Sequence, residues 1–354
     1  MLYLSNALIK SSPAHASWAR QIMAERALFN ASETALAKAS GLANSAAILP
    51  QDAWRMIDDV TMRIMRNDEG QAYMSDLMAL AKPVNIGKLA VITRAASDAG
   101  VVKRSMSGQT GAAIDKVQYS YSGTPIPIFD AAYGREWREW ATLQSEGFDA
   151  LADDQEAAVA AINRDIAGYV LDGDTTIKAD TYVGYGIRTN PKSKSINLGT
   201  AAGGANIDLT AAATTAEAIE NFVNTVIGKA MDDNNLTGRK LNLYISPEIA
   251  RNWDRPYSGA TGFKEGSIRD VLLKNRRIAK IVDTFKLTGN AFFGFVADPL
   301  FIRPLVGMAV STIAIPRTMP RDNYNFLVAG ALGIEVRNDY AGHGGVFYSV
   351  VVNA

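Results

Sequence analysis

Residues 148–172, FDALADDQEAAVAAINRDIAGYVLD, decide how the rest of the chain is interpreted. Apolar residues recur at helical spacing, which predicts one long helix with a single apolar stripe. That stripe consists of Phe148, Leu151, Val159, Ile162, Ile166, Tyr169 and Val170. Gly173 follows where a left-handed C-terminal cap is expected. About 25 residues at about 1.5 Å each give a rod of roughly 37 Å, so we predict that this helix is the spine of a domain.

The side of this helix away from the stripe carries mostly small residues. These residues are Ala157, Ala158, Ala160, Ala161 and Gly168. Small side chains let another backbone pass close by, and two interpretations stay open. The helix makes a tight crossing inside its own core, or it is a surface over which elements of other chains lie.

Composition limits the classes of function that the chain can have. The chain has 354 residues, which is enough for two domains and a sizeable core. Lys plus Arg equals 36 and Asp plus Glu equals 36, so the formal net charge is zero. A protein that binds nucleic acid through its whole surface is expected to be basic. A net charge near zero also does little to oppose self-association.

Two further absences in the sequence exclude other classes of protein. The chain has no cysteine, which excludes disulfides, thiolate metal sites and a cysteine nucleophile. No apolar run approaches the roughly 18 residues of a membrane helix, so we expect no membrane partner. The first residues, MLYLSNALIK, lack a basic segment before their apolar residues, and we therefore expect no signal peptide.

The N-terminal part of the chain reads as helical. We predict helices at residues 17–40, 50–65 and 71–81, the last one stopped by Pro83. Short turns join these helices, so they either pack as a bundle or form an arm that lies across a neighbouring molecule.

A long ribbon is predicted next. The segments KLAVITRA and KVQYSYSG both have the pattern of strands, and SDAGVVKRSMSGQTGA between them is rich in Gly and Ser. An isolated two-stranded ribbon is marginally stable in water. This ribbon must therefore lie on its own domain or on a neighbouring copy.

The chain is expected to leave the ribbon through two prolines. Pro125 and Pro127 favour extended backbone and remove donors, which predicts an edge or a crossing rather than a central strand. We predict a short helix over residues 133–146 that places Tyr133, Trp137 and Trp140 together and anchors the base of the ribbon to the spine helix. The simpler alternative for these aromatic residues is ordinary core packing.

The second half of the chain alternates between helices and strands. After a loop-rich stretch at residues 172–206, the residues at 214–217 match a capping box and open a helix. Further helices are predicted from Pro247, with Ser246 as N-cap, and over 267–274. Strands are predicted near residues 241–246, 278–285, 292–297, 308–315, 327–338 and 346–352. This is an α+β pattern around one sheet, and we expect the last two strands to return to the domain of the spine helix.

The sequence offers little that indicates catalysis. The two histidines, His15 and His343, belong to no metal-binding or nucleophile motif. Gly184 and Gly186 lie in YVGYGIRTNP, where a turn is the better interpretation than a phosphate site. We therefore predict no catalytic, cofactor-binding or metal-binding residue.

The order of these parts resembles the major capsid proteins of tailed bacteriophages, of the Hong Kong phage type, and their relatives the encapsulin shell proteins. The overall layout covers nearly the whole chain, and the closest local likeness runs through residues 117–191. Within them it includes the Ile-Pro-Ile of residues 126–128, the WREW of residues 137–140, the acidic start of the spine helix, the VLDG of residues 170–173 and the GIRTNP of residues 186–191.

The resemblance implies an α+β phage capsid fold with five parts. An N-terminal arm with helices would occupy residues 1–83, an extended β-ribbon loop 84–125, and a peripheral domain with the spine helix 126–204. An axial domain with a mixed sheet would occupy residues 205–325, and residues 326–354 would return as strands to the peripheral domain.

The resemblance also implies a function and partners. Many copies would form pentamers and hexamers of an icosahedral head that encloses double-stranded DNA, contacted non-specifically on the inner face. Scaffolding, portal or decoration proteins are further implied partners. Assembly would occur in the cytoplasm of a bacterial host, and the mature protein would lie in the virion. The alternatives are an encapsulin nanocompartment that encloses a cargo enzyme and, more remotely, an enzyme that uses the loops around Gly184 and His343.

The resemblance finally implies which residues act. Contacts between subunits would come from the extended loop, through Arg94, Val101, Val102, Lys103, Arg104, Met106, Gln118, Tyr119 and Tyr121. The hinge and anchor of that loop would be formed by Pro125, Pro127, Trp137 and Trp140.

Overall fold

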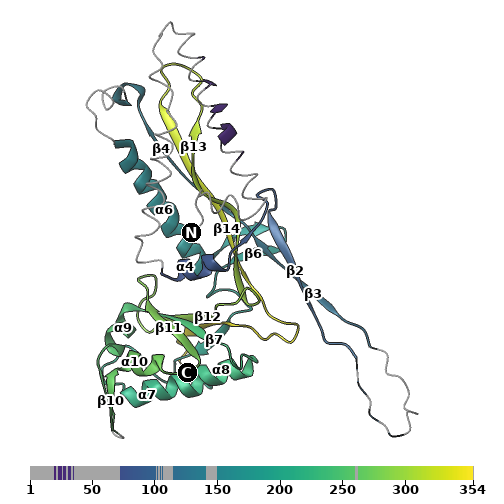
Figure 1. Ribbon diagram of the computed structural model, residues 1–354, viewed down its shortest axis with the longest axis vertical. Coiled ribbons are helices and arrows are strands. Elements are labelled where there is room, and N and C mark those ends of the chain that lie inside the picture. The colour runs from purple at the N-terminus through teal and green to yellow at the C-terminus, as the bar shows by residue number, and fades with distance from the viewer. Residues whose placement is uncertain are drawn as a thin grey trace. The chain divides into compact units, whose positions relative to one another are not determined.

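The computed structural model describes most of the chain after residue 71 (Figure 1). The described residues are 72–100, 115–140, 150–259 and 262–353, with isolated positions between 20 and 35 and at 102, 104 and 106. The positions described between 20 and 35 are helical, whereas the helix predicted at 50–65 lies outside the described residues. The chain forms two compact units. They consist of residues 1–89, 126–171 and 304–334, and of residues 90–125, 172–303 and 335–354.

The first unit contains a four-stranded sheet in the order β1-β13-β14-β4. Its strands are β1 (Lys82–Pro83), β13 (Ile302–Ile315), β14 (Tyr324–Val336) and β4 (Ile128–Arg135). β4 pairs antiparallel with β14, from Tyr324 opposite Arg135 to Ala331 opposite Ile128. β4 is an edge strand, as the prolines before it predicted.

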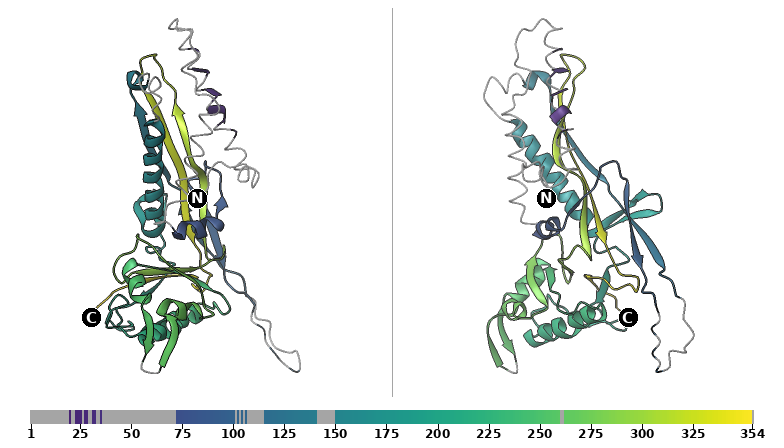
Figure 2. Two further views of the ribbon diagram at one scale, coloured as in Figure 1. Left: turned by 60° about the vertical axis from the view of Figure 1, so that its left-hand side comes forward. Right: turned by 45° about the vertical axis from the view of Figure 1, so that its right-hand side comes forward.

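The predicted spine helix is α6 (Ala150–Asp172), which runs beside the long strands in both views of Figure 2. Its described stripe residues are buried, as predicted: Val159, Ile162, Ile166, Tyr169 and Val170. The ring of Tyr169 meets the ring of Phe129 of β4 edge to face, with the centroids 5.4 Å apart. Gln155, fully buried on α6, donates through Nε2 to Oγ1 of Thr312 on β13 at 3.1 Å. These contacts fix α6 against the sheet.

A short helix, α4 (Ala72–Ala79), packs against α6. It buries Tyr73, Met74 and Leu77, and the hydroxyl of Tyr73 donates to the carbonyl oxygen of Ala167 on α6 at 2.8 Å. The helix ends shortly before Pro83, as the sequence predicted.

The region around Tyr133 differs from the prediction of a helix over residues 133–146. Tyr133 belongs to β4, and its ring stacks on Phe326 of β14 with centroids 5.3 Å apart. Helical geometry begins only after Arg135, and residues 141–149 lie outside the described residues. Pairing with β14 has therefore overridden the local helical pattern, because tertiary contacts are stronger than intrinsic propensity.

The second unit contains a five-stranded sheet in the order β11-β8-β12-β15-β7. Its strands are β11 (Ile278–Asp283), β8 (Leu241–Ile245), β12 (Phe292–Val296), β15 (Val346–Val350) and β7 (Lys194–Asn197). β15 was expected to accompany β14 but lies here, between β12 and β7. Its residues Val346 and Phe347 are fully buried, which suits an apolar strand in the interior of a sheet.

Short helices and a hairpin pack with this sheet. They are α7 (Ala216–Asn221), the π-helix η3 (Phe222–Ile227), α8 (Gly228–Asp233), α9 (Pro247–Trp253), α10 (Ile268–Leu273), β9 (Pro256–Gly259) and β10 (Gly262–Ser267). Ser246 caps α9, as predicted, by accepting from the backbone N–H of Ile249. The cap of α7 is Thr215, one residue after the predicted position. Thr214 does not cap the helix because its hydroxyl donates to the carbonyl oxygen of Asp208.

The stretch after α6 was expected to be loop-rich, but it forms a hairpin of β5 (Gly173–Ala179) and β6 (Tyr182–Tyr185). Gly173 caps α6 with φ of +70°, as predicted. A Cβ atom on Gly173 would lie 2.3 Å from the nitrogen of Gly186, and one on Gly186 would lie 2.4 Å from the nitrogen of Gly173. A glycine is thus required at residue 186 because two backbone segments approach closely there. This packing explains Gly186 without a role in phosphate binding.

The predicted ribbon is formed by β2 (Ala90–Ala96) and β3 (Tyr119–Pro125), which lie side by side in both views of Figure 2. The antiparallel register runs from Ala90 opposite Pro125 to Ala96 opposite Tyr119. The ribbon contacts β6 at Gly123, where an added Cβ atom would lie 2.4 Å from Cδ2 of Tyr182. The Tyr182 ring therefore occupies the space that a side chain at residue 123 would need.

We predict that Tyr73→Phe lowers the free energy of unfolding by about 1 kcal/mol, because one hydrogen bond is lost while the buried ring remains. Urea denaturation of the purified chain measures this change. Tyr121→Phe is the control, since Tyr121 is 65% exposed and its hydroxyl is expected to contribute little. Equal stability of all three proteins would argue against the contact between α4 and α6.

We predict that Gly123→Ala destabilises the chain by about 1–3 kcal/mol, because the new methyl group overlaps the Tyr182 ring. Tyr182→Ala removes the obstacle, so the double variant should be more stable than the sum of the two single changes predicts. The coupling free energy expected from a double-mutant cycle is about 0.5–3 kcal/mol. Additive effects would show that the ring does not lie on Gly123.

Candidate functional site

One face of the ribbon combines aromatic, aliphatic and cationic side chains. Arg94 lies opposite Tyr121 and Ala96 opposite Tyr119, and alternation along each strand places Ile92, Arg94, Tyr119 and Tyr121 on one side. We call these four residues the aromatic ribbon face. Ile92 is 58% exposed, Tyr119 50% and Tyr121 65%. Contiguous exposure of this kind is typical of a surface that contacts another protein.

Charge and aromatic character are combined on this face. The guanidinium carbon of Arg94 lies 5.2 Å from the centroid of the Tyr119 ring, in a cation–π arrangement. Gly123 belongs to the same side of the ribbon and is covered by Tyr182 of the same chain. The chain thus covers this face at Gly123, whereas Ile92 opposite it and the two tyrosines farther along the ribbon remain exposed.

The other predicted contact residues are placed differently. Val102, Arg104 and Met106 are exposed, whereas Val101 and Lys103 lie outside the described residues. The side-chain oxygen of Gln118 accepts a hydrogen bond from the Tyr340 hydroxyl at 2.8 Å, so Gln118 contacts its own chain. Ile92 was not predicted, although the alternation in VITRA already places it on the side of Arg94.

The four predicted hinge and anchor residues separate into two groups. Pro125 is buried and Pro127 half-buried, where the chain leaves the ribbon. Trp140 stacks on Tyr324 of β14 with centroids 4.5 Å apart, whereas Trp137 is 41% exposed. The eight residues of β4 separate Pro127 from both tryptophans along the chain.

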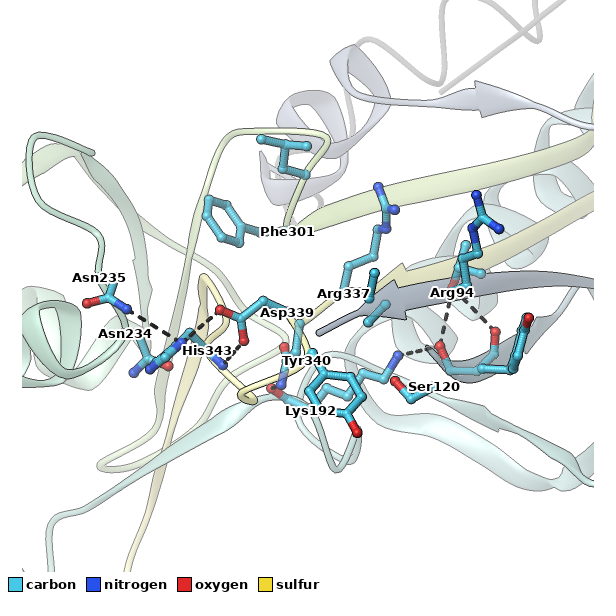
Figure 3. A pocket seen from close by; sticks show the side chains of 17 residues that line it. Arg94, Ser120, Lys192, Asn234, Asn235, Phe301, Arg337, Asp339, Tyr340 and His343 are labelled. Carbon is cyan, nitrogen blue, oxygen red and sulfur yellow. Dashed lines mark hydrogen bonds and ion pairs between the residues drawn. The ribbon is translucent and has the colours of Figure 1, made fainter. Parts of the chain in front are cut away.

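A second feature is a cleft of about 550 Å³ beside the ribbon, shown in Figure 3. We call it the ribbon cleft. Residues 93–96 and 120–122 of the ribbon line it, together with Lys192, Asn234, Asn235, Leu300, Phe301, residues 337–340 and His343. Several segments of the second unit that are far apart in the sequence therefore meet around one cavity.

Lys192 is a half-buried cation of the ribbon cleft. Its ammonium group donates to the hydroxyl of Ser122 on β3 at 2.6 Å, as the dashed line in Figure 3 marks. Partial burial lowers the pKa of Lys192, the charge of Glu335 opposes this shift, and the charge of Arg337 adds to it. The pKa of Lys192 is lowered overall, because the effect of burial on the ammonium exceeds the effect of the Glu335 charge.

The carboxylates near the ribbon cleft are already engaged. Glu335 is almost fully buried and accepts from Nε of Arg303 at 2.5 Å, while Nε of Arg337 stays 3.8 Å away. Asp339 accepts from the backbone N–H of His343 at 2.7 Å and lies 2.8 Å from His343 Nδ1. Burial alone would raise the pKa of Asp339, but the contacts with His343 outweigh burial and lower it. His343 thus holds a turn together, as the sequence predicted, while His15 lies outside the described residues.

Two other kinds of site are absent from the residues that the structure describes. No three His, Asp or Glu side chains in this part of the chain gather closely enough to hold a metal ion. No helix within the same residues is long and apolar enough to cross a membrane.

The chain is similar in fold to several solved structures. A virus-like particle from Pyrococcus furiosus has 15% identity and a TM-score of 0.54, with 84% of this chain and 99% of that chain covered. The capsid of Myoviridae phage XM1 has 13% identity and a TM-score of 0.56, with 80% and 92% covered. A chain from Microbacterium phage Oxtober96 has 12% identity and a TM-score of 0.51, with 80% and 91% covered. The α+β phage capsid fold that the resemblance implied is confirmed.

Sequence comparison identifies a family. No curated protein sequence matches the chain. The model of a family of unknown function, DUF6260, matches residues 44–349, which is most of the chain. The chain therefore belongs to the DUF6260 family and has the fold of a phage major capsid protein.

Proposed function

We propose that this chain is the major capsid protein of a tailed phage, and that many copies assemble into an icosahedral head around double-stranded DNA. The observation that carries the proposal is the aromatic ribbon face, in a chain with the capsid fold. Tyr119, Tyr121 and Ile92 are at least half exposed on a ribbon, and a ribbon of two strands is marginally stable by itself. A neighbouring copy would cover these side chains.

Repetition makes a weak contact sufficient. In a head-to-tail arrangement, each copy would give its ribbon to one neighbour and receive the ribbon of another, and such contacts close into rings. Pentamers and hexamers are rings of this kind. Each contact in a closed shell is made many times, so its effect multiplies without any single strong bond. The net charge of zero adds little repulsion between copies.

The proposal assigns roles to the parts of the chain. Residues 1–83 would be the N-terminal arm and 84–125 the extended loop. The four-stranded sheet with α6 would be the peripheral domain, so β13 belongs to it although residues 205–325 were expected to be axial. The five-stranded sheet with its helices would be the axial domain, so β7 belongs to it although residues 126–204 were expected to be peripheral. Residues 326–336 would complete the peripheral sheet, while β15 belongs to the five-stranded sheet. The contact residues would be those of the aromatic ribbon face, with the exposed Val102, Arg104 and Met106 beyond it.

Partners and location follow from the same proposal. The inner face of the head would contact DNA without reading its sequence, and scaffolding, portal or decoration proteins would join the shell. The protein would assemble in the host cytoplasm and remain in the virion. Its role would be structural rather than catalytic, because the polar groups of Asp339 and His343 are engaged with each other within one turn.

Electron microscopy of the purified protein tests the proposal directly. Closed icosahedral particles are expected, with double-stranded DNA inside those recovered from an infected host. Particles that enclose a cargo enzyme would instead identify an encapsulin nanocompartment. A chain that stays monomeric at all concentrations, with a catalytic activity, would reject both shell functions.

We predict that replacing residues 95–115 by a short Gly/Asn turn leaves a soluble, folded chain that does not build normal shells. The expected reason is that the outer ribbon contributes to contacts with a neighbour and not to the core of its own chain. Circular dichroism checks the fold, and electron microscopy with sedimentation checks assembly. Normal particles from this variant would refute the role of the ribbon.

We predict that changing Tyr119 and Tyr121 together to Ser raises the protein concentration needed for assembly by about tenfold or more. Loss of aromatic contact area at an interface costs about 1–2 kcal/mol or more, and about 1.4 kcal/mol corresponds to a factor of ten. Light scattering against concentration measures the threshold. The matched control changes both residues to Phe, which keeps the rings and should assemble nearly normally. An unchanged threshold in the Ser variant would show that no neighbour covers this face.

A further inference from the structure

We propose that the ribbon cleft binds an acidic peptide segment of a partner protein, with carboxylates against Lys192 and Arg337 and an apolar residue against Leu300 and Phe301. Nothing in a capsid function requires such a site. The inference therefore goes beyond the proposed function and is tested on the purified chain, whether or not it assembles.

The first argument is the balance of charge in the ribbon cleft. Lys192 and Arg337 line it, against the single carboxylate of Asp339. Arg94 also borders the cleft, but its guanidinium lies over the Tyr119 ring on the aromatic ribbon face. Lys192 comes from the loop before β7, and Arg337 is the residue just after β14. Asp339 is already held by two contacts with His343. Arg337 pairs with Glu335 at 3.8 Å, but Arg303 shares that carboxylate. Positive charge therefore remains in excess around the cleft, and a ligand with carboxylates would balance it.

The second argument is the state of Lys192. Its ammonium group is half-buried and donates to a neutral hydroxyl, that of Ser122. A partly buried charge is costly unless an opposite charge compensates it. The charge of Glu335 compensates the buried ammonium only in part, since Glu335 pairs with Arg303 and Arg337 and does not line the cleft. An incoming carboxylate would supply the missing compensation without displacing an existing ion pair of Lys192 among the described residues.

The third argument is the size and shape of the lining. A volume of about 550 Å³ is in the range of pockets that enclose a ligand of many atoms, and it exceeds what a single small anion needs. The ribbon contributes small side chains to it, among them Thr93, Ala95 and Ser120. Small side chains leave room for an extended chain.

The fourth argument separates a peptide from a nucleic acid. The apolar residues Leu300, which is 60% exposed, and Phe301 line the same cleft. Asp339 also lines it, and its lowered pKa keeps it negatively charged at neutral pH. Nucleic-acid sites favour continuous positive charge along a phosphate backbone. A mixture of cations, one anion and apolar side chains suits a peptide that has both acidic and apolar residues.

The test uses fluorescence anisotropy of the full chain with two labelled pentapeptides. The acidic probe has the sequence Leu-Glu-Asp-Glu-Leu, and its amide counterpart has the sequence Leu-Gln-Asn-Gln-Leu. The acidic peptide should bind at least about tenfold more tightly, since charge-assisted hydrogen bonds are roughly twice as strong as neutral ones. Its affinity should fall in high salt, because screening weakens partly exposed charge pairs.

Variants locate the site on the chain. Combining Lys192→Gln with Arg337→Gln should weaken binding of the acidic peptide by about 10–100-fold, corresponding to about 1.4 kcal/mol per factor of ten. Lys229→Gln is the matched control, because Lys229 is exposed on α8 and does not line the cleft. Ser120→Glu places a carboxylate at the exposed lining position of β3 and should weaken binding similarly. Because Ser120 is exposed, this variant is expected to fold normally, and thermal unfolding of each variant checks this.

Three results would overturn the proposal. They are equal binding of the acidic and amide peptides, an unchanged affinity in folded Ser120→Glu and in the double variant, and binding of an oligothymidine but not of the acidic peptide. Ser120→Glu, which keeps the hydrogen bond between Lys192 and Ser122, is expected to leave the assembly threshold near that of the parent chain. Failure of shell formation in the parent chain would not affect the peptide result, so the two proposals fail separately.

Discussion

The stability of a two-stranded ribbon is the constraint on which the rest of this structure depends. β2 and β3 pair over seven residues each, but a ribbon of two strands is marginally stable unless another element packs against it. Next to the start of β3, Gln118 accepts a hydrogen bond from the Tyr340 hydroxyl, and two further contacts support the base of the ribbon. Tyr182 covers Gly123, and Lys192 donates to Ser122. Both contacts come from the segment after α6, which the close approach of Gly173 and Gly186 holds in place.

Local signals in the sequence predicted the elements that bury one clear face. The stripe of α6 and the Ser246 cap of α9 depend on residues within a few positions of one another, and both were found as predicted. Strand β4 was partly missed because Tyr133 is held by Phe326, almost two hundred residues away in the chain. The hairpin of β5 and β6 was missed because its Gly and Thr residues resemble a loop until the backbone crossing at Gly186 is known.

The candidate surfaces differ in how far the sequence could reveal them. The aromatic ribbon face follows from alternation within two strands, so Arg94, Tyr119 and Tyr121 could be selected from the sequence alone. The ribbon cleft could not, because Lys192 and Arg337 are separated along the chain and neither belongs to a motif. Buried Glu335 also had no local signal, since its partner Arg303 lies on the neighbouring strand.

The two surfaces share strand β3, which has a physical consequence. Tyr121 belongs to the aromatic ribbon face, and its neighbour Ser122 bonds to Lys192 of the ribbon cleft. A ligand that holds Lys192 in place would also restrain Ser122, and therefore the strand that presents Tyr121. Rigidity gained on one side lowers the entropic cost of binding on the other. A ligand in the ribbon cleft would then favour contact between copies by reducing the motion of β3, without changing the shape of that strand.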